Sequence, residues 1–183
     1  MTTANSLEQA RFNMIEQQIR PWEVLDGRVL ELLGRVRRED FAPAAHRALA
    51  FTDMELPLTQ PAVDGQCMLA PRVQARLVQD LAVQSTDKVL VIGTGSGFTT
   101  ALLAKLAQRV VSLEIDEAIA RAARGHLQAA GIANADVRVA DAAANGFAAC
   151  AAEAPWNVIL VAGSLAEVPQ ALLTLLAPGG RLA

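Results

Sequence analysis

Residues 89–98 read Val-Leu-Val-Ile-Gly-Thr-Gly-Ser-Gly-Phe, and this stretch decides the fold of the chain. Four apolar, mostly β-branched residues lead directly into three glycines at alternate positions. A segment that is apolar on both faces is typical of a strand buried inside a parallel sheet and covered by helices on both sides. The glycines permit a tight turn, and they let backbone N–H groups approach a ligand near the positive end of the next helix. Phe98, Leu102 and Leu106 follow at helical spacing and predict that helix.

A second strand is predicted over residues 109–114, Arg-Val-Val-Ser-Leu-Glu, and it ends on the carboxylate of Glu114. Nucleotide-binding α/β domains hold ribose hydroxyls with an acid at this position. The glycine turn and Glu114 together predict a site for a nucleoside-containing cofactor. The alternative is an ordinary turn followed by a strand-end charge in water.

Further strands alternate with helices along the rest of the chain. We expect strands at 136–140 and 157–161, helices at 116–130 and 169–176, and a strand that begins at 181 after a Pro-Gly-Gly turn. This alternation predicts an α/β fold with a doubly wound, mostly parallel sheet. Asp141 directly follows the third strand, so we expect it beside Glu114 at the carboxyl edge of the sheet. There it would accept a hydrogen bond from the exocyclic amine of an adenine, or else it caps the following turn.

The N-terminal part predicts helices before the sheet begins. Helical patterns cover residues 6–20 and 26–38, and the second ends with Arg35, Arg37 and Arg38. Cations are favourable at the negative end of a helix dipole, so we expect solvated arginines there rather than phosphate ligands.

A proline-containing segment over residues 51–71 has little periodicity and is followed by a helix from Pro71 to Val83. Irregular segments of this length are uncommon in compact domains and are often functional. On the helix, we expect Val73, Leu77 and Leu81 to form the buried face.

Composition limits the classes of function. The chain has 183 residues, 52% of them hydrophobic, and a net charge of −3, which gives no basic footprint for nucleic acid. We expect one compact domain in two parts, 1–85 with the helices and the loop, and 86–183 with the cofactor-binding core. The first ten residues do not resemble a signal peptide, and no apolar stretch has membrane length, so we expect a cytoplasmic protein without a membrane contact. Cys67 and Cys150 are too few for a disulfide framework or a zinc site, and no metal is expected.

With these residues in view, the chain resembles the protein-L-isoaspartate O-methyltransferase family, which belongs to the class I S-adenosylmethionine-dependent methyltransferases. The resemblance spans nearly the whole chain, and its N-terminal part is specific to this family. The matching segments are Met14–Arg20, Val29–Pro43, Leu56–Leu58, Gly65–Pro71, Val89–Phe98, Asp141, Pro155–Ile159 and Pro178–Leu182.

The resemblance implies a Rossmann-like fold, with S-adenosylmethionine as the methyl donor and S-adenosylhomocysteine as the product. It implies methylation of the α-carboxyl of L-isoaspartyl residues in damaged proteins, a repair reaction. The cofactor would then be bound by Gly93, Thr94, Gly95, Gly97, Glu114, Ile115, Asp141 and Ala142. The partners would be isoaspartate-bearing proteins or peptides, and the protein would be a monomer or a homodimer.

The same resemblance places the reacting groups against the Gly65–Pro71 loop. In the family this loop typically reads Gly-Gln-Thr-Ile-Ser, and its serine is the residue usually assigned to the active site. Here Cys67, Met68 and Leu69 follow Gly-Gln, so Leu69 occupies the serine position. Leucine donates no hydrogen bond to an acceptor carboxylate. The family also has an acid where Val91 stands, and its chain continues past Gly-Gly-Arg-Leu with further strands, which we expect to be missing here.

These departures leave three alternatives open. Leu69 favours a methyltransferase for a more apolar acceptor, and Leu69 with Val91 favours a homologue that binds the cofactor without catalysis. An NAD-dependent oxidoreductase is the third alternative, but the three alternating glycines do not match the Gly-x-Gly-x-x-Gly spacing of the dinucleotide fingerprint.

Overall fold

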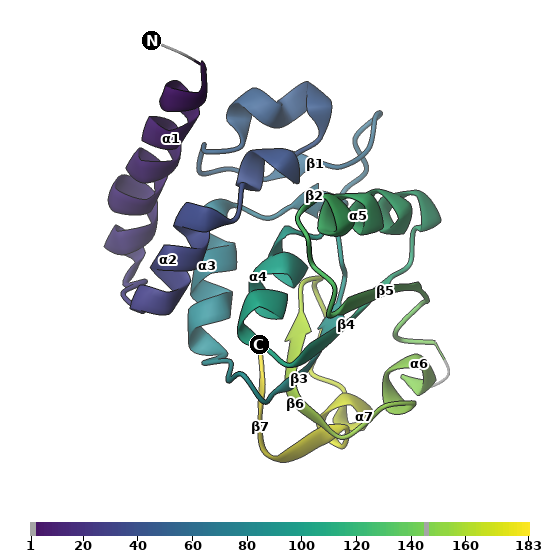
Figure 1. Ribbon diagram of the computed structural model, residues 1–183. Coiled ribbons are helices and arrows are strands. Elements are labelled where there is room, and N and C mark those ends of the chain that lie inside the picture. The colour runs from purple at the N-terminus through teal and green to yellow at the C-terminus, as the bar shows by residue number, and fades with distance from the viewer. Residues whose placement is uncertain (1–2, 145–146) are drawn as a thin grey trace.

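A five-stranded parallel sheet forms the centre of the protein (Figure 1). The structure is a computed structural model and describes residues 3–144 and 147–183. The strand order is β5-β4-β3-β6-β7, so the chain starts in the middle of the sheet, builds one half and then returns to build the other. The strands are β3 (Lys88–Ile92), β4 (Arg109–Glu114), β5 (Ala135–Val139), β6 (Trp156–Val161) and β7 (Leu176–Leu182). The predicted α/β class and doubly wound parallel sheet are confirmed.

Alternate residues of the central strand pack into two different cores. Val89 and Val91 belong to the core under α4 (Phe98–Leu106) and the N-terminal helices, whereas Leu90 belongs to the core under α6 (Ala148–Ala151) and α7 (Gln170–Leu173). Successive side chains of a strand point to opposite faces, and both faces of β3 are therefore buried. This double burial is why the strand reads as an unbroken apolar run.

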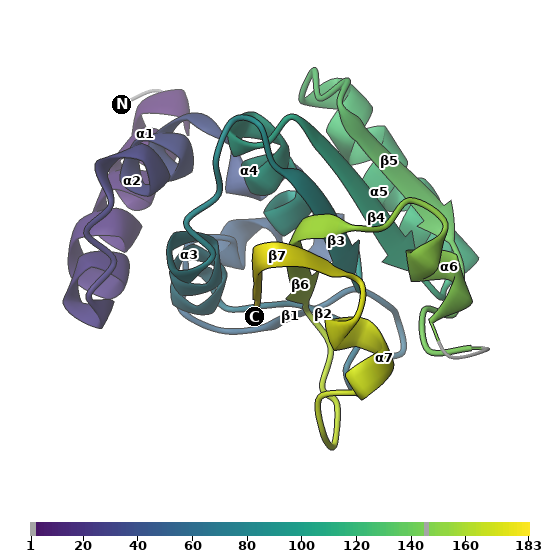
Figure 2. The same ribbon diagram turned by 90° about the horizontal axis from the view of Figure 1, so that it is seen from below.

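Helices cover both faces of the sheet, and those of the N-terminal half form a further layer beyond α3 and α4 (Figure 2). Asp116 accepts hydrogen bonds from the N–H groups of Ala118 and Ile119, which confirms the predicted start of α5. The α-helices are α1 (Thr3–Met14), α2 (Gly27–Arg35), α3 (Pro71–Asp80), α4 (Phe98–Leu106), α5 (Glu117–Ala129), α6 (Ala148–Ala151) and α7 (Gln170–Leu173); α1 continues as a π-helical turn, η1 (Ile15–Ile19), and the 3-10 helices are η2 (Arg20–Trp22), η3 (Arg38–Asp40) and η4 (Ala44–Leu49). Within residues 3–144 and 147–183, no helix is both long and apolar enough to cross a bilayer.

The segment before α3 is largely irregular, as predicted, but it contains two short strands. β1 (Leu56–Pro57) pairs antiparallel with β2 (Cys67–Met68), outside the main sheet. The pairing folds residues 58–66 into a loop that returns toward the sheet.

Two predictions are corrected: the buried face of α3 and the position at which the last strand begins. The buried residues of α3 are Pro71, Gln74, Ala75 and Val78. Leu81, directly after the helix, is buried as expected, but Val73 and Leu77 are only partly buried, so the expected face is wrong for these two. The final strand begins at Leu176, before the Pro-Gly-Gly sequence, and its pairing with β6 is irregular between Trp156 and Val158. The expected turn therefore lies within the strand as an irregularity, and α7 is shorter than predicted.

Candidate functional site

The glycine turn lies at the carboxyl end of β3, next to the point where the strand order reverses. Gly93, Gly95 and Gly97 all have positive φ angles, of 89°, 55° and 86°, which side chains rarely tolerate. The turn is anchored to the neighbouring strand because the Gly93 and Thr94 N–H groups both donate to the Leu113 carbonyl, at 2.9 and 3.1 Å. A Cβ atom at Gly93 would lie 3.6 Å from Ala162 Cβ, directly after β6. In open α/β sheets this crevice is where ligands bind.

Glu114 holds the turn from the adjacent strand. Its side chain accepts one hydrogen bond from Gly95 N–H at 2.8 Å and another from Asp116 N–H at 3.2 Å. The residue is only 8% exposed. A buried carboxylate that is held by two backbone donors keeps a defined direction, so it is a preorganised acceptor at this edge of the sheet.

The second wall of the site comes from the irregular segment before α3. A Cβ atom at Gly95 would lie 3.6 Å from both the Cys67 carbonyl oxygen and Leu58 Cδ1, so this segment lies directly on the glycine turn. Between the two walls is a cavity of about 160 Å³. Its lining residues are Leu58, Gly65, Gln66, Cys67, Met68, Leu69, Gln74, Gly93, Thr94, Gly95, Ser96, Thr99, Glu114, Ile115, Ile119, Ala162 and Gly163.

Arg38 is buried behind this second wall, and the expectation of a solvated cation is wrong for it. It is 1% exposed, and its guanidinium donates to Ala50 O at 2.7 Å and Leu69 O at 2.8 Å, and also to Gln74 Oε1. The arginine thus links η3, the irregular segment and α3. Arg35 and Arg37 are exposed as predicted, in ion pairs with nearby carboxylates.

The sequence-predicted site residues divide into two groups. Cys67, Met68, Leu69, Gly93, Thr94, Gly95, Glu114 and Ile115 meet around the cavity. Gly97 instead packs under the turn, where a Cβ would lie 3.3 Å from Ala123 Cβ. Asp141 is exposed and accepts a hydrogen bond from Ala143 N–H at 3.0 Å, and the neighbouring Ala142 is buried. Neither Asp141 nor Ala142 lines the cavity, so their contact with an adenine stays a prediction.

Several lining residues were not predicted from the sequence. Gln74 Nε2 donates to Thr99 Oγ1 at 2.7 Å, joining α3 to the start of α4 inside the site. Gln74 stands at helical spacing from Val78 and Leu81, and this spacing could have placed it on the buried face of α3. The face expected from Val73 and Leu77 does not include it. Ala162 and Gly163 directly follow β6, and the strand-edge rule alone would have found them.

Cys67 lines the cavity as a neutral thiol. Burial, and then the negative charge of the nearby Glu55, raise the pKa of Cys67 to about 11. Burial also raises the pKa of Cys150 to about 11. Thiols with such pKa values are protonated near neutral pH and are poor nucleophiles.

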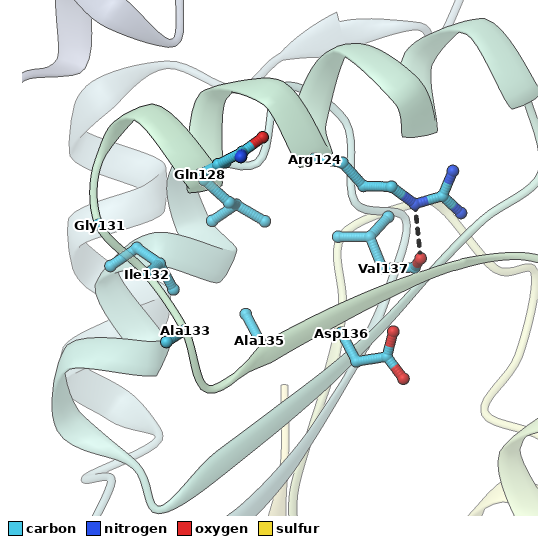
Figure 3. A pocket seen from close by; sticks show the side chains of 9 residues that line it. Arg124, Gln128, Gly131, Ile132, Ala133, Ala135, Asp136 and Val137 are labelled. Atoms are coloured by element: carbon cyan, nitrogen blue, oxygen red, sulfur yellow. Dashed lines mark hydrogen bonds between the residues drawn. The ribbon is translucent and has the colours of Figure 1, made fainter.

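A second cavity of about 480 Å³ lies between α5 and the edge strand β5 (Figure 3). Arg124 Nε donates to the Val137 carbonyl at 2.9 Å (Figure 3), so this backbone acceptor of the edge strand is already hydrogen-bonded. The cavity shares no lining residue with the site at the glycine turn. Covering an edge strand with a charged side chain limits pairing with other chains, which accounts for this arrangement without a ligand.

Comparison with known proteins identifies the family. The model of the protein-L-isoaspartate(D-aspartate) O-methyltransferase family matches residues 9–183. This chain belongs to that family. It is 40% identical over 177 residues to protein-L-isoaspartate O-methyltransferase 1 of Syntrophobacter fumaroxidans, covering 97% of this chain and 79% of the relative. It is 38% identical over 179 residues to protein-L-isoaspartate O-methyltransferase of Methanoculleus marisnigri, covering 98% and 78%.

Solved structures give the same fold. The chain superposes with a TM-score of 0.77 on a putative protein-L-isoaspartate O-methyltransferase of Plasmodium falciparum, solved in complex with S-adenosyl-L-homocysteine, at 18% identity and covering 96% of this chain and 81% of that one. A second protein-L-isoaspartate O-methyltransferase gives a TM-score of 0.74 at 22% identity, and the chain spans about half (54%) of its length. At these identities the structures establish the methyltransferase fold.

Proposed function

We propose that the protein is an S-adenosylmethionine-dependent methyltransferase that methylates the α-carboxylate of L-isoaspartyl residues in damaged proteins. One observation carries the proposal. In a member of this family, the glycine turn, Glu114 and the Cys67–Leu69 segment meet around one cavity at the switch point of the sheet.

The residues present fit the cofactor. Gly93 and Gly95 leave space that a Cβ would fill, so the backbone of the turn can contact a bound amino acid group closely. Glu114 presents a buried, oriented carboxylate to ribose hydroxyls. Ile115 is 66% exposed beside it and offers an apolar surface to the adenine.

Cofactor binding also requires movement of the second wall. Cavities that hold small-molecule ligands usually measure about 300–1,000 Å³, whereas this one has about 160 Å³. The segment over residues 58–69 lies on Gly95 and is therefore the wall expected to move when the cofactor enters.

When bound, S-adenosylmethionine supplies a methyl group on a sulfonium sulfur; the acceptor oxygen forms the new C–O bond and the sulfur keeps the electron pair of the broken C–S bond. A carboxylate acceptor is already ionised near pH 7, so no protein group has to remove a proton. The protein's task is to hold the acceptor oxygen, the methyl carbon and the sulfur in line and to exclude water. Glu114 and the glycine turn fix one side of this arrangement, and the Cys67–Leu69 segment encloses the other.

A second candidate acceptor follows from Leu69. This side chain lines the cavity where the family has serine, and it offers the acceptor contact area but no hydrogen bond. The second candidate is therefore methyl transfer to a more apolar acceptor.

The experiment has two measurements on one sample. Isothermal titration measures the binding of S-adenosylhomocysteine. A separate titration with NAD tests the alternative oxidoreductase function. Transfer of labelled methyl is then measured with an isoaspartyl peptide and with the same peptide containing ordinary aspartate. We expect S-adenosylhomocysteine to bind, NAD not to bind, and only the isoaspartyl peptide to be methylated.

Other outcomes have distinct meanings. Binding without transfer to either peptide excludes the isoaspartyl acceptor and supports an apolar acceptor, or a protein that only binds the cofactor; a panel of small apolar acceptors separates these two. Binding of NAD alone contradicts the methyltransferase assignment.

The remaining expectations belong to the same proposal. Residues 1–85 would form the part that closes over cofactor and substrate, and residues 86–183 the part that binds the cofactor. The protein would act in the cytoplasm on protein substrates, as a monomer or a homodimer, and would not act on nucleic acid.

A further inference from the structure

The charges around the cavity do not match the proposed acceptor. Among the described residues that line it, the ionisable side chains are Glu114, which is acidic, and Cys67, whose thiol is neutral near pH 7. The acceptor is itself a carboxylate. Like charges in a partly buried site repel each other. Apart from the sulfonium of a bound methyl donor, no group among the described lining residues offers a positive charge to an anionic acceptor.

Arg38 is a cation placed directly behind the cavity wall. Its guanidinium contacts Leu69 O, Gln74 Oε1 and Ala50 O, and Gln74 in turn contacts Thr99. Leu69, Gln74 and Thr99 all line the cavity. The cation is therefore separated from the cavity by a single layer of residues.

The charge of Arg38 is not neutralised by direct contact. All three of its hydrogen-bond acceptors are uncharged groups, and no ion pair found among residues 3–144 and 147–183 includes it. Its neighbour Glu39 pairs with Arg11 and Arg37, and Asp53 pairs with Arg72 at 2.8 Å. The negative charge of Asp53 still acts on the guanidinium and favours its charged form, and the centroid of the Phe98 ring lies 5.1 Å from Arg38 Cζ.

Burying an unpaired cation is costly. Burial lowers the pKa of Arg38 to about 9, so the group is still charged at pH 7. A neutral side chain of similar length would avoid the cost of desolvating a charge. This buried cation lies beside the cavity at which the anionic acceptor is expected.

We propose that Arg38 makes the site select an anionic acceptor, by supplying from behind Leu69 and Gln74 the positive charge that the cavity lining lacks. This inference rests on the proposed function. Arg38 acts through the wall and is a specificity-determining and positioning residue, because the structure places no part of it in the lining.

A purely structural role makes a different prediction. If Arg38 only clamps Ala50 and Leu69, its loss weakens binding of charged and neutral acceptors alike. If its charge matters, loss of the charge removes the preference for a charged acceptor. The ratio of the two affinities therefore distinguishes the roles.

The test measures peptide binding by titration calorimetry to the protein saturated with S-adenosylhomocysteine, so that no turnover is needed. One peptide contains isoaspartate, and the matched peptide contains isoasparagine, in which a carboxamide replaces the α-carboxylate. Wild-type protein should bind the isoaspartyl peptide more tightly. Arg38→Met should reduce this preference about tenfold, the scale of one unit charge acting across a partly buried site. Arg38→Lys should retain most of it.

Gln74→Glu provides a test that leaves Arg38 in place. It puts a carboxylate against the guanidinium and neutralises it, while Thr99 can donate its hydroxyl hydrogen to the new oxygen. We expect the same loss of preference as in Arg38→Met. Gln128→Glu adds an equal charge at an exposed position of α5, away from the site, and should leave the preference unchanged.

Three results overturn the inference. An unchanged affinity ratio in Arg38→Met contradicts it while the proposed function stands, whatever Gln74→Glu does, because a carboxylate at position 74 lines the cavity and would itself repel the anion. Equal binding of both peptides by the wild-type protein also contradicts it. If wild-type protein binds S-adenosylhomocysteine but neither peptide, the isoaspartyl acceptor fails and this inference fails with it.

Discussion

The two walls of the site are built in different ways. The sheet wall, residues 93–97 with Glu114, is positioned by backbone hydrogen bonds between adjacent strands, such as those from Gly93 and Thr94 to Leu113. The segment wall, residues 58–69, contributes only Cys67–Met68 to a two-residue strand pair, and the buried Arg38, which also contacts Gln74, donates to its Leu69 carbonyl. Backbone pairing in a buried sheet leaves little freedom, whereas a segment held by a few side chains can open at lower cost.

Because the walls differ in rigidity, we expect one to bind the cofactor and the other to select the acceptor. On the proposed function, the rigid wall would bind the cofactor in a fixed orientation. The segment wall would admit ligands and, through Leu69 and Arg38, would determine which acceptor is used. Substitutions in the first wall should therefore affect cofactor binding and stability, and those in the second should affect the acceptor.

The largest effect is expected for Glu114→Ala. The substitution removes the acceptor proposed for the ribose hydroxyls and leaves the Gly95 N–H without its partner. Hydrogen bonds to charged groups contribute about 1.5–3 kcal/mol each, so the affinity for S-adenosylhomocysteine should fall about a hundredfold. Titration calorimetry measures this, with Glu117→Ala, an exposed acid at the start of α5, as the control. A loss below threefold would remove Glu114 from the cofactor site.

Alanine substitutions of two glycines compare the walls directly. Gly97 and Gly65 both have positive φ, but a Cβ at Gly97 would lie 3.3 Å from Ala123 Cβ, whereas nothing lies within 4 Å at Gly65. Backbone strain alone costs about 1–2 kcal/mol. We expect Gly97→Ala to lower the free energy of unfolding by about 2 kcal/mol or more, and Gly65→Ala by about 1 kcal/mol. Urea denaturation tests this, and equal losses would contradict the greater rigidity of the sheet wall.

Leu69→Ser should change the acceptor and not the cofactor. A hydroxyl at this position can donate to the acceptor carboxylate, so kcat/KM for the isoaspartyl peptide should rise about tenfold. The affinity for S-adenosylhomocysteine should stay within about twofold. Leu69→Ala is the matched control, because it removes the same bulk without adding a donor. If serine and alanine behave alike, the gain comes from space and not from the hydrogen bond.

The smallest effect on activity is expected at Cys67. Because the pKa of its thiol is raised to about 11, the thiol is neutral near pH 7, and Cys67→Ala should change kcat by less than about twofold. Alkylation of Cys67 in a Cys150→Ala background should be slow at pH 8 and rise with pH toward 11. The unfolded chain ionises this thiol from about pH 9, so the stabilisation from its raised pKa is present below pH 9 and is lost as the pH rises toward 11. Rapid alkylation at pH 8 would indicate an activated thiol instead.

How far the sequence predicts the site differs between the walls. The glycine turn, the strand that carries Glu114 and the order of strands follow from contiguous patterns, because apolar runs, glycine spacing and strand ends are local properties. Gln74 was not predicted to line the site and Arg38 was expected to be solvated, and both misses have the same physical reason. Each is a polar residue on a helix or at its end, and whether it lies in water or in the core depends on segments far along the chain. Arg38 contacts Ala50, Leu69 and Gln74, which are separated from it by 12, 31 and 36 residues.

The amino-acid sequence by itself therefore determined the parallel α/β sheet, the glycine turn and the acid beside it, since these depend on local periodicity and spacing, and its motifs carried the resemblance to a methyltransferase family. The tertiary structure alone decided that the segment over residues 58–69 lies on the turn, that Gln74 faces the cavity, and that Arg38 is a buried cation behind Leu69. Those features depend on desolvation and on long-range contacts, which only exist once the chain has folded.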